Sequence, residues 1–554
     1  MHVARCGTHL VLVGLVSTFA AGLARPGLLD EWTGAVAGAA EREVLYNGIP
    51  LPETWPPRIE RLPRQPVTPP YLLSPPGVIP IDVGRQLLVD DFLIERTDLK
   101  RTYHAATYWP TNPVLKPDRP WETKTQPNPC AMVFSDGVWY DPQDGLFKMW
   151  YMAGYVAGTA YATSKDGIHW EKPQLDVFPG TNLVQQGWRD SSTVWLDHAA
   201  ADPRARFKMA LYTGDRLSLT TSPDGIHWSQ PVRSGPTGDR TTFLYNPFRK
   251  RWVYGLRIDA AGFGRARNYW EAEDFVKDAN WSPGQSALWV GADRADPQRE
   301  DLKTPCQLYN LDCAAYESLL LGLFSIWRGQ PKDRAKPNEV CLGFSRDGFH
   351  WYRPDRRPFI PVSDKQGDWN WCNVQSAGGA CLVIGDKLYF YVSGRAGVPG
   401  STSSGACSTG LATLRRDGFA SLDAGEVEGS LTTRPVHFQG RYLFVNADAN
   451  KGTLRAEILD PDGRVIPPFT RDNCIPLSKD TTLGRIRWKQ SDEIGKLAGR
   501  PVRFRFHLTK GNLYAFWVSP DPSGASYGCV AAGGPGLTGP TDTVGSQALE
   551  SVRR

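Results

Sequence analysis

The sequence predicts an all-β fold, a five-bladed β-propeller followed by a small C-terminal β-sandwich. Three observations lead to this prediction. They are a recurring short motif, a second repeated turn that precedes the motif in each of the first units, and the loss of the motif after residue 425, where strand-length runs alternate with turns. The motif is Ser-x-Asp-Gly-x-His-Trp, at residues 164–170, 222–228 and 345–351 (Phe precedes His in the third copy). Asp bonds its own turn and Gly adopts positive φ freely, so the motif indicates a tight hairpin.

The spacing of the motif gives the number of units. A weaker copy surrounds Asp417-Gly418-Phe419, and the four copies lie 58, 123 and 70 residues apart, so the middle interval is a double one. Inside it, Glu273-Asp274-Phe275 followed by Trp281 keeps the Asp and the Trp of a degraded copy. Five units of about 50 to 70 residues each have room for a four-stranded blade.

A second repeated element supports the same division. An Asp-Pro or Asn-Pro turn precedes an aromatic strand start in the first three units, at residues 141–142, 202–203 and 246–247. In the first unit we expect strands over residues 130–140, 147–153 and 159–164, and a fourth strand opened by Trp170.

The N-terminal region contains no repeat. Residues 1–24 have an apolar run from Leu10 to Leu23 that ends in small residues, which is typical of a cleaved secretory signal; a single membrane anchor is the alternative. Residues 25–84 are rich in proline and are expected to be an extended segment. The propeller is expected over residues 85–424, where an early strand at 86–94 would complete the last blade.

After residue 425 the hairpin motif is absent and strand-length runs alternate with Gly, Asp and Pro turns. Residues 441–445, 454–459 and 502–506 are such runs, so a β-sandwich is expected over residues 425–520. The Gly- and Pro-rich residues 521–554 are expected to be a disordered tail.

Composition excludes several classes of protein. The net charge of +5 arises from 63 basic and 58 acidic residues without a dense basic run, so no nucleic-acid partner is expected. No later segment is long and apolar enough for a membrane span, so no membrane partner is expected after signal removal. Nine cysteines remain beyond the signal; Cys306 with Cys313, or Cys372 with Cys381, would be local disulfides, and buried free thiols are the alternative. No motif requires a cofactor or zinc, although a calcium ion would be compatible with acidic residues near the axis.

The innermost strand of each propeller blade lines the axis, so side chains near its start should converge on one site. Carboxylates, arginines and aromatic rings at these positions suit a carbohydrate, because charged groups bind hydroxyls and aromatic faces stack on sugar rings. Two such carboxylates suffice to cleave a glycosidic bond. The candidates, in chain order, are Trp121, Glu122, Gln126, Trp188, Arg189, Asp190, Asp239, Arg240, Tyr309, Asn310, Asp312, Asp368 and Asn373.

The five repeats, the segment Trp188-Arg189-Asp190 and a C-terminal β-sandwich together resemble the five-bladed propeller glycoside hydrolases of families 32, 43 and 68, in particular family 32-like secreted bacterial proteins. The resemblance covers residues 85–520. In family 32 an Arg-Asp-Pro motif in the second blade carries an Asp that stabilises the transition state. Arg189-Asp190 matches this motif with Ser191 in place of Pro, so the resemblance implies that role for Asp190.

Two other family motifs are altered. Thr125-Gln126-Pro127 stands where the family has Asn-Asp-Pro, which places an amide at the position of the nucleophile. Either Glu122 takes the carboxylate role, or the mechanism differs, or the protein only binds sugar. The Glu-Cys motif that carries the family's acid is absent from the third unit, where Asp239 is the nearest carboxylate; Glu317 is an alternative further along the chain.

The main functional hypothesis is therefore an exported glycoside hydrolase, periplasmic or extracellular, that cleaves an oligo- or polysaccharide with Asp190, Asp239 and Glu122 as candidate catalytic carboxylates. A non-catalytic carbohydrate-binding propeller is the first alternative. A sialidase-like enzyme would need three inner-strand arginines and a tyrosine nucleophile, and Arg189 and Arg240 supply only two. The hairpin residues Asp166 and Asp224 are expected to be structural, because five copies of a motif cannot each be the single catalytic site.

Overall fold

The computed structural model describes residues 42–553. The expected signal at residues 1–24 lies outside this range. Strands and turns dominate the described residues, so the predicted all-β class is confirmed. The α-helices there are short, namely α1 (Pro70–Leu73), α2 (Pro120–Thr123) and α3 (Ser546–Arg553). None of them has the length and apolarity needed to cross a membrane.

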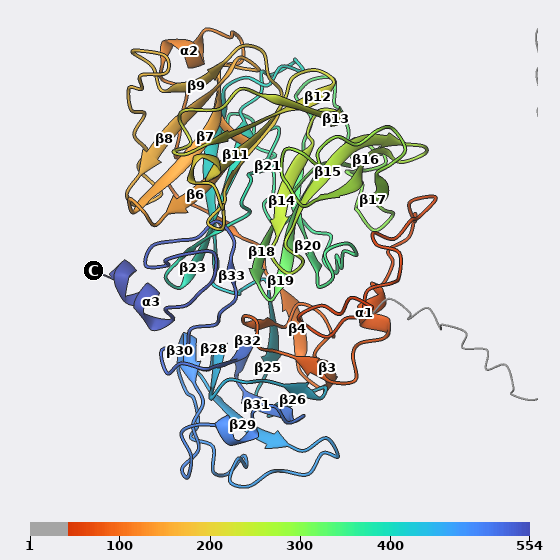
Figure 1. Ribbon diagram of the computed structural model, residues 1–554, viewed down its shortest axis with the longest axis vertical. Helices are drawn as coiled ribbons and strands as arrows, with labels where there is room; N and C mark the ends of the chain where they lie inside the picture. The colour runs from red at the N-terminus through yellow and green to blue at the C-terminus, as the bar shows by residue number, and fades with distance from the viewer. Residues whose placement is uncertain (1–41, 554) are drawn as a thin grey trace, which may run out of the picture. The chain divides into compact units, whose positions relative to one another are not determined.

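Three antiparallel sheets, each of four consecutive strands, follow one another along residues 131–291 (Figure 1). The repeated Pro-containing turns join the first two strands of each sheet, as expected. The strands are β6 (Ala131–Asp141), β7 (Leu146–Ala153), β8 (Gly158–Ser164) and β9 (Leu183–Gln186); β10 (Ser192–Leu196), β11 (Phe207–Tyr212), β12 (Arg216–Ser222) and β13 (Val232–Pro236); and β14 (Thr242–Asn246), β15 (Arg251–Ala260), β16 (Gly264–Ala272) and β17 (Ala287–Gly291).

One strand of the first sheet begins later than expected. The fourth strand is β9, which starts at Leu183, whereas Trp170 lies in a loop that contains two isolated bridges, Glu171 with Thr163 and Leu175 with Thr181. The reason is that the Trp170 ring packs edge-on against Tyr391 of another sheet, 5.7 Å away between centroids.

Each of the next two sheets includes a strand from a distant part of the chain. The fourth sheet contains β18 (Gln307–Glu317), β19 (Leu319–Trp327) and β20 (Glu339–Ser345), and β33 (Cys529–Val530) pairs with the end of β18. The fifth contains β21 (Gln375–Ser376), β22 (Leu382–Ile384), β23 (Lys387–Arg395) and β24 (Cys407–Arg415), and β5 (Thr107–Tyr108) pairs with β24.

These pairings correct two expectations. The strand expected at 86–94 does not close the last unit; that position is taken by β5, because Gln86 and Leu87 (β2) pair instead with Phe516 and Ala515. Residues 521–553 are not a disordered tail. They pack on the fourth and fifth sheets, where Val530 and Ala532 are fully buried, because their apolar side chains extend the core.

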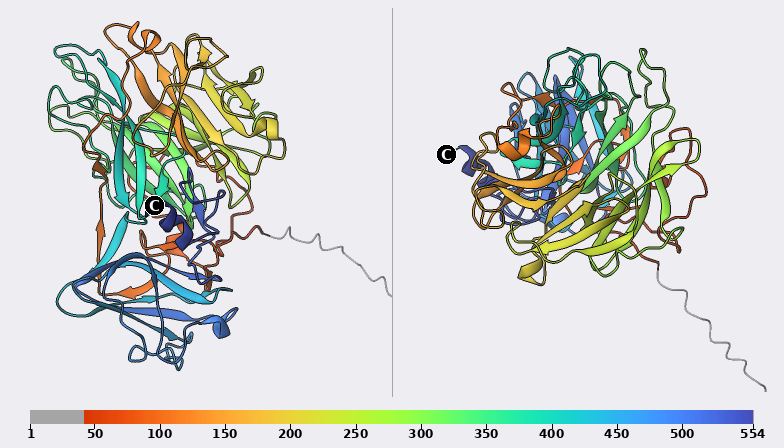
Figure 2. Two further views of the ribbon diagram at one scale, coloured as in Figure 1. Left: turned by 90° about the vertical axis from the view of Figure 1, so that its left-hand side faces the viewer. Right: turned by 90° about the horizontal axis from the view of Figure 1, so that it is seen from above.

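The five innermost strands contact one another in chain order, which gives a propeller-like arrangement. Strand β6 contacts β10, β10 contacts β14, β14 contacts β18, β18 contacts β21, and β21 contacts β6. Seen from above, the sheets follow one another around a common centre (Figure 2). The starts of these strands are therefore brought together, as the sequence predicts.

The recurring motif forms the expected tight turn. In the first copy, Asp166 Oδ1 accepts hydrogen bonds of 2.8 Å from the backbone N–H groups of Ile168 and His169, and Oδ2 lies 2.7 Å from His169 Nδ1. The same bonds recur around Asp224 and Asp347. These aspartates are structural, because their carboxylates are occupied by their own turns.

Each turn also joins its sheet to the preceding one in the ring. Tyr391 Oη donates to the carbonyl of Gly167, Trp150 Nε1 to the carbonyl of Gly225 (2.7 Å), and Trp289 Nε1 to that of Phe349 (2.7 Å). At three junctions between neighbouring sheets, the motif thus supplies a rigid turn whose carbonyl accepts a hydrogen bond from the preceding sheet.

These turns predict a specific loss of stability in acid. Although partial burial opposes the shift, the bonds from His169 and Ile168 lower the pKa of Asp166 to about 2, and those from His227 and Ile226 do the same for the pKa of Asp224. Since the unfolded-state value is about 3.9, their stabilising contribution is present above about pH 4 and is lost as pH falls towards 2. Urea unfolding at several pH values should show a shallower loss between pH 4 and 2 for the Asp166→Asn/Asp224→Asn variant than for the wild type. Parallel pH curves for the two proteins would contradict this.

Two further sheets contain most of the strands in residues 425–519, together with short strands that precede the first unit. One has the order β30-β28-β32-β25-β4 with β2 on β32, and the other β29-β31-β26-β3. Phe504 and Phe506 of β31 pack against Phe516 of β32, with centroids 5.8 and 5.2 Å apart. The strands are β2 (Gln86–Leu87), β3 (Ile94–Thr97), β4 (Lys100–Tyr103), β25 (Ala420–Ala424), β26 (Gly429–Thr433), β28 (Tyr442–Asp448), β29 (Thr453–Leu459), β30 (Asp480–Arg485), β31 (Arg503–Thr509) and β32 (Gly511–Ser519). Two short strands, β1 (Ile79–Pro80) and β27 (Val436–His437), pair with each other.

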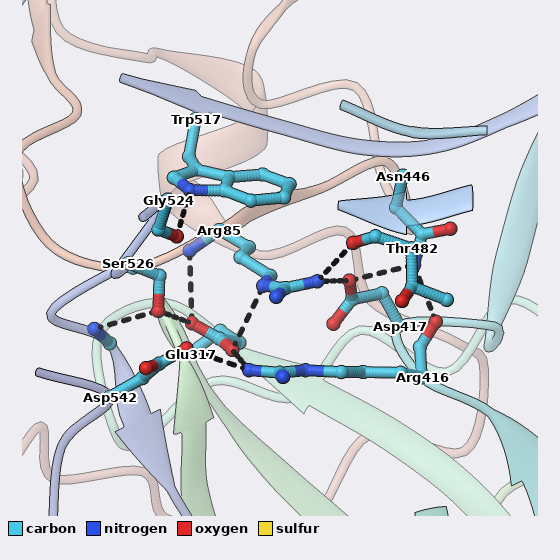
Figure 3. Close-up of polar contacts among 12 residues, drawn as sticks. Arg85, Glu317, Arg416, Asp417, Asn446, Thr482, Trp517, Gly524, Ser526 and Asp542 are labelled. Atoms are coloured by element: carbon cyan, nitrogen blue, oxygen red, sulfur yellow. Dashed lines mark hydrogen bonds and ion pairs between the residues drawn. The ribbon is translucent and has the colours of Figure 1, made fainter. Parts of the chain in front are cut away.

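A buried ionic cluster joins these two sheets to the fourth unit (Figure 3). Arg85 Nη1 lies 2.9 Å from Asp417 Oδ2, and Arg85 Nε lies 3.4 Å from Glu317 Oε1. Arg416 Nη2 lies 2.9 Å from Asp542 Oδ2 and 3.3 Å from Glu317 Oε1. All five side chains are excluded from solvent, so each charge is stabilised by its ion-pair partners and not by water.

All nine cysteines of the described residues are free thiols, so the two expected local disulfides are not formed.

Candidate functional site

The innermost strands meet in a buried hydrogen-bond network. Asp312 Oδ2 in β18 accepts bonds from Asn310 Nδ2 (2.6 Å), Ser135 Oγ (3.1 Å) and Ser376 Oγ (2.6 Å). Arg240 Nη2 donates to Ser135 Oγ at 2.9 Å. Because the donors come from several sheets, this network fixes the sheets relative to one another. Asn310 and Asp312, both predicted site residues, are therefore part of the floor of the site.

The segment before β10 is held by an ion pair that sequence reasoning missed. Arg189 binds Asp136 of β6 through two hydrogen bonds, of 2.7 Å from Nη1 and 3.0 Å from Nη2, and both side chains are fully buried. Arg189 was expected to bind substrate; its guanidinium is instead occupied by Asp136. Burial raises the pKa of Asp136, and Arg189 opposes that shift. Asp136 lies mid-strand, without a local motif that would have identified it.

This ion pair positions Asp190, the next residue. Arg189 Nε donates to the carbonyl of Asp190 at 2.8 Å, which fixes the backbone. Among the described residues, the buried Oδ1 atom of Asp190 has no hydrogen-bond partner. Burial raises the pKa of Asp190, Arg240 opposes the shift, and the negative charge of Asp239 adds to it. Asp190 is thus a carboxyl group with a free oxygen and a pKa raised by burial.

Asp239 lies before β14 in the opposite electrostatic setting. Its two carboxylate oxygens lie 3.2 and 3.1 Å from Arg265 Nη1, and its Oδ1 lies 3.5 Å from Arg257 Nε. Burial alone would raise the pKa of Asp239, but Arg265 and Arg257 outweigh burial and lower it. The pKa of Asp239 is therefore shifted downwards, while that of the neighbouring Asp190 is shifted upwards. Two nearby carboxyl groups with such different pKa values are typical of an acid and a base in catalysis.

The third proposed catalytic carboxylate, Glu122, is occupied by structural contacts. Its Oε2 accepts bonds from the N–H groups of Asp118 and Arg119 and lies 2.8 Å from Lys172 Nζ, and its Oε1 accepts from Tyr151 Oη at 2.7 Å. Glu122 is fully buried and caps α2. The expectation that it supplies a catalytic carboxylate is therefore corrected, because four donors hold its two oxygens and its side chain is excluded from solvent, whereas the side chain of Asp239 is 25% exposed.

The remaining residues of the first unit lie away from the two aspartates. Gln126 is exposed and donates to the carbonyl of Thr123. Trp121 donates to Asn182 Oδ1 at 3.0 Å and, with Trp188, lines a cavity of about 390 Å³ beside the first sheet. Since Trp188 is two residues from Asp190, this cavity flanks the site.

The two predicted residues of the fifth unit lie in different settings: Asn373 is fully buried, and Asp368 is bonded within its own loop. Asn373 is fully buried, accepts from Gln375 Nε2 at 2.9 Å, and leaves its Nδ2 without a partner among the described residues. Asp368 instead accepts from Ser363 Oγ at 2.5 Å within its own loop. Asp368 is thus a turn residue and not a binding residue, because its carboxylate stabilises the loop.

Cationic side chains around Tyr309 were also missed. Arg265 lies 4.6 Å and Lys336 4.9 Å from the centroid of the Tyr309 ring. Although burial opposes ionisation, Lys336, Arg265 and Arg395 together lower the pKa of Tyr309. The pattern Arg265-x-Arg267 in β16 could have indicated these cations from the sequence, because alternate residues of a strand share a face.

In the part of the chain that the structure describes, no group of three or more His, Cys, Asp or Glu side chains is arranged to hold a metal ion.

No protein-family model matches the chain, and no curated protein matches it in sequence. Among solved structures, an N-acetylgalactosamine deacetylase from F. plautii has a TM-score of 0.40 at 12% identity, covering 58% of this chain and 96% of that one. A thermostable family-43 glycoside hydrolase has a TM-score of 0.38 at 11% identity, covering 53% and 94%. A fructofuranosidase from Schwanniomyces occidentalis has a TM-score of 0.34 at 11% identity, covering 75% and 96%. Structures of the family 43 and family 32 type are thus among the chain's neighbours, but similarity at this level carries no conclusion about its chemistry.

Proposed function

We propose that this chain is an exported glycoside hydrolase, with a five-bladed β-propeller followed by a C-terminal β-sandwich. The observation that carries the proposal is the pair Asp190 and Asp239, which lie just before neighbouring innermost strands and have pKa values shifted in opposite directions. The free Oδ1 atom of Asp190 adds to it, because a buried carboxyl oxygen without a partner is costly unless a ligand uses it.

The two residues would have different roles. Asp190, whose pKa is raised by burial, donates a proton to the glycosidic oxygen as the bond to the anomeric carbon breaks. Asp239, kept ionised by Arg265 and Arg257, attacks the anomeric carbon or takes a proton from the attacking water. Proton donation by Asp190 replaces the transition-state role that the family resemblance implied for it.

A non-catalytic carbohydrate-binding protein is the second candidate. It is favoured by the first unit, where Glu122 and Asp136 are both occupied and Gln126 is an amide. No free carboxylate is thus found in the described part of that unit at the position where the resembling families have their nucleophile.

The test is the release of reducing ends from a panel of neutral and acidic oligosaccharides, polysaccharides and aryl glycosides. Hydrolysis of at least one oligosaccharide or polysaccharide by the wild type, with none by the Asp190→Asn variant, is the expected result. Binding of a sugar by calorimetry without any hydrolysis across the panel would overturn the enzymatic proposal and support the binding protein.

A further inference from the structure

The site contains more positive charge than its carboxylates neutralise. Around Asp190 and Asp239 lie six cationic side chains: Arg240, Arg257, Arg265, Arg267, Arg395 and Lys336. The acidic groups of the same region are Asp190, Asp239, Asp312 and Asp259, of which Asp259 pairs with Arg257 at 2.9 Å, and burial raises the pKa values of Asp190 and Asp312. A neutral sugar would not require this surplus.

Four of these cations lack an acidic partner. Among residues 42–553, no carboxylate lies within ion-pair distance of Arg240, Arg267, Arg395 or Lys336. Arg267 donates only to the carbonyls of Ala266 and Tyr309, and Arg395 only to hydroxyls, from Nη1. Burial and the charges of Arg240 and Arg265 lower the pKa of Arg267 to about 9. Burying charges without partners costs free energy, so a group of opposite charge is needed to offset it.

Two of the cations remain accessible, at the face of Tyr309. Arg265 and Lys336 are only half-buried and lie 4.6 and 4.9 Å from the Tyr309 ring centroid. Arg265 uses only Nη1 to bind Asp239, and its Nε and Nη2 make no hydrogen bond within the described chain. These N–H groups are free donors next to an aromatic face, and the Lys336 ammonium, which interacts with the side chain of Tyr309, lies beside them.

We propose that the site binds an anionic saccharide, in which a carboxylate or sulfate group is held by Lys336 and Arg265 while Tyr309 contacts the sugar ring. The deeper arginines, Arg240, Arg267 and Arg395, supply a positive field that favours the anion. This inference rests on the proposed function for the location of the sugar, but it concerns binding and is measured without hydrolysis.

The experiment measures binding by calorimetry to the Asp190→Asn protein, which does not consume the ligand. The probes are a galacturonic acid trisaccharide, a sulfated galactose trisaccharide and a neutral galactose trisaccharide. One acidic probe should bind at least about tenfold more tightly than the neutral one, and its affinity should fall with added salt. The acidic probe that binds identifies the anion as carboxylate or sulfate.

Variants of Lys336 locate the anion. Lys336→Met should weaken binding of that acidic probe by about tenfold or more, and should leave the neutral probe unchanged. Lys336→Arg should restore most of the affinity, and Lys387→Met, which removes an exposed lysine elsewhere, should change nothing. Melting curves ensure that all variants are folded.

Several results would overturn this proposal. One is equal affinity for the neutral and acidic probes, and another is that neither acidic probe binds. A third is that Lys336→Met weakens binding of the neutral and acidic probes to the same extent. Tight binding of an acidic probe, with no hydrolysis of any glycoside in the panel by the wild type, would refute the proposed hydrolase and leave the anionic site standing. Hydrolysis of neutral sugars, with no preference for acidic ones in binding, would support the proposed hydrolase and refute the anionic site.

Discussion

Replacing Asp190 by asparagine is expected to lower kcat/KM on an oligosaccharide by about 10³-fold or more, the upper part of the range for loss of a general acid. The amide cannot donate a carboxylic acid proton to the leaving oxygen. The fold should not change, because Asp190 Oδ1 has no partner within residues 42–553, and the backbone carbonyl that Arg189 binds is retained. Initial rates of reducing-end release measure the effect.

A matched control separates this effect from a general loss of charge. Asp462→Asn removes a carboxylate that is 70% exposed in the C-terminal sheets and should leave activity unchanged. The melting temperature of the Asp190→Asn protein should stay within about 2 °C of that of the wild type. Equal activity of the Asp190→Asn and Asp462→Asn proteins would refute the role assigned to Asp190.

Replacing Arg416 by methionine is expected to have the largest effect on stability, about 3–5 kcal/mol. Arg416 lies 2.9 Å from Asp542 and 3.3 Å from Glu317, and the change would leave both carboxylates buried with too little positive charge. Burial already raises the pKa of Glu317, and Arg85 and Arg416 oppose that shift. Differential scanning calorimetry at pH 7 should show a melting temperature lower by several degrees.

The control for this prediction is Arg464→Met, since Arg464 is 76% exposed and pairs with the exposed Asp462 at 2.7 Å. Its removal should change stability by less than about 0.5 kcal/mol. If Arg416→Met and Arg464→Met melt at the same temperature, the buried cluster does not hold residue 542 and its neighbours to the fourth unit.

The repeating part of the fold could be predicted because its signal is local. The Asp166 and Asp224 turns contain their own hydrogen-bond partners within four residues, so the sequence records the structure directly. Strands β5 and β33 could not be predicted, because each has two residues and its partner lies more than 200 residues away. Backbone pairing at such distance leaves no periodic pattern in a short segment.

Part of the candidate site could be proposed from the sequence because the repeat defines where the innermost strands begin. Asp190 and Asp239 could be named as candidates because they precede innermost strands, a position that the repeat defines. Glu122 was assigned wrongly because four donors from α2, its flanking residues and the first sheet meet at its carboxylate only in the folded chain. Lys336 and Arg395 follow no motif and reach Tyr309 only through the packing of the sheets.

The most direct test of the central proposal compares Asp190→Asn with Asp239→Asn on an aryl glycoside whose leaving group needs no proton. Such a substrate bypasses the acid but not the base or nucleophile. If the roles are correct, Asp190→Asn retains most of the wild-type rate on this substrate, while Asp239→Asn loses about 10³-fold or more. If both variants hydrolyse it at the wild-type rate, or Asp239→Asn is the more active of the two, the assignment of acid and base to these residues is wrong.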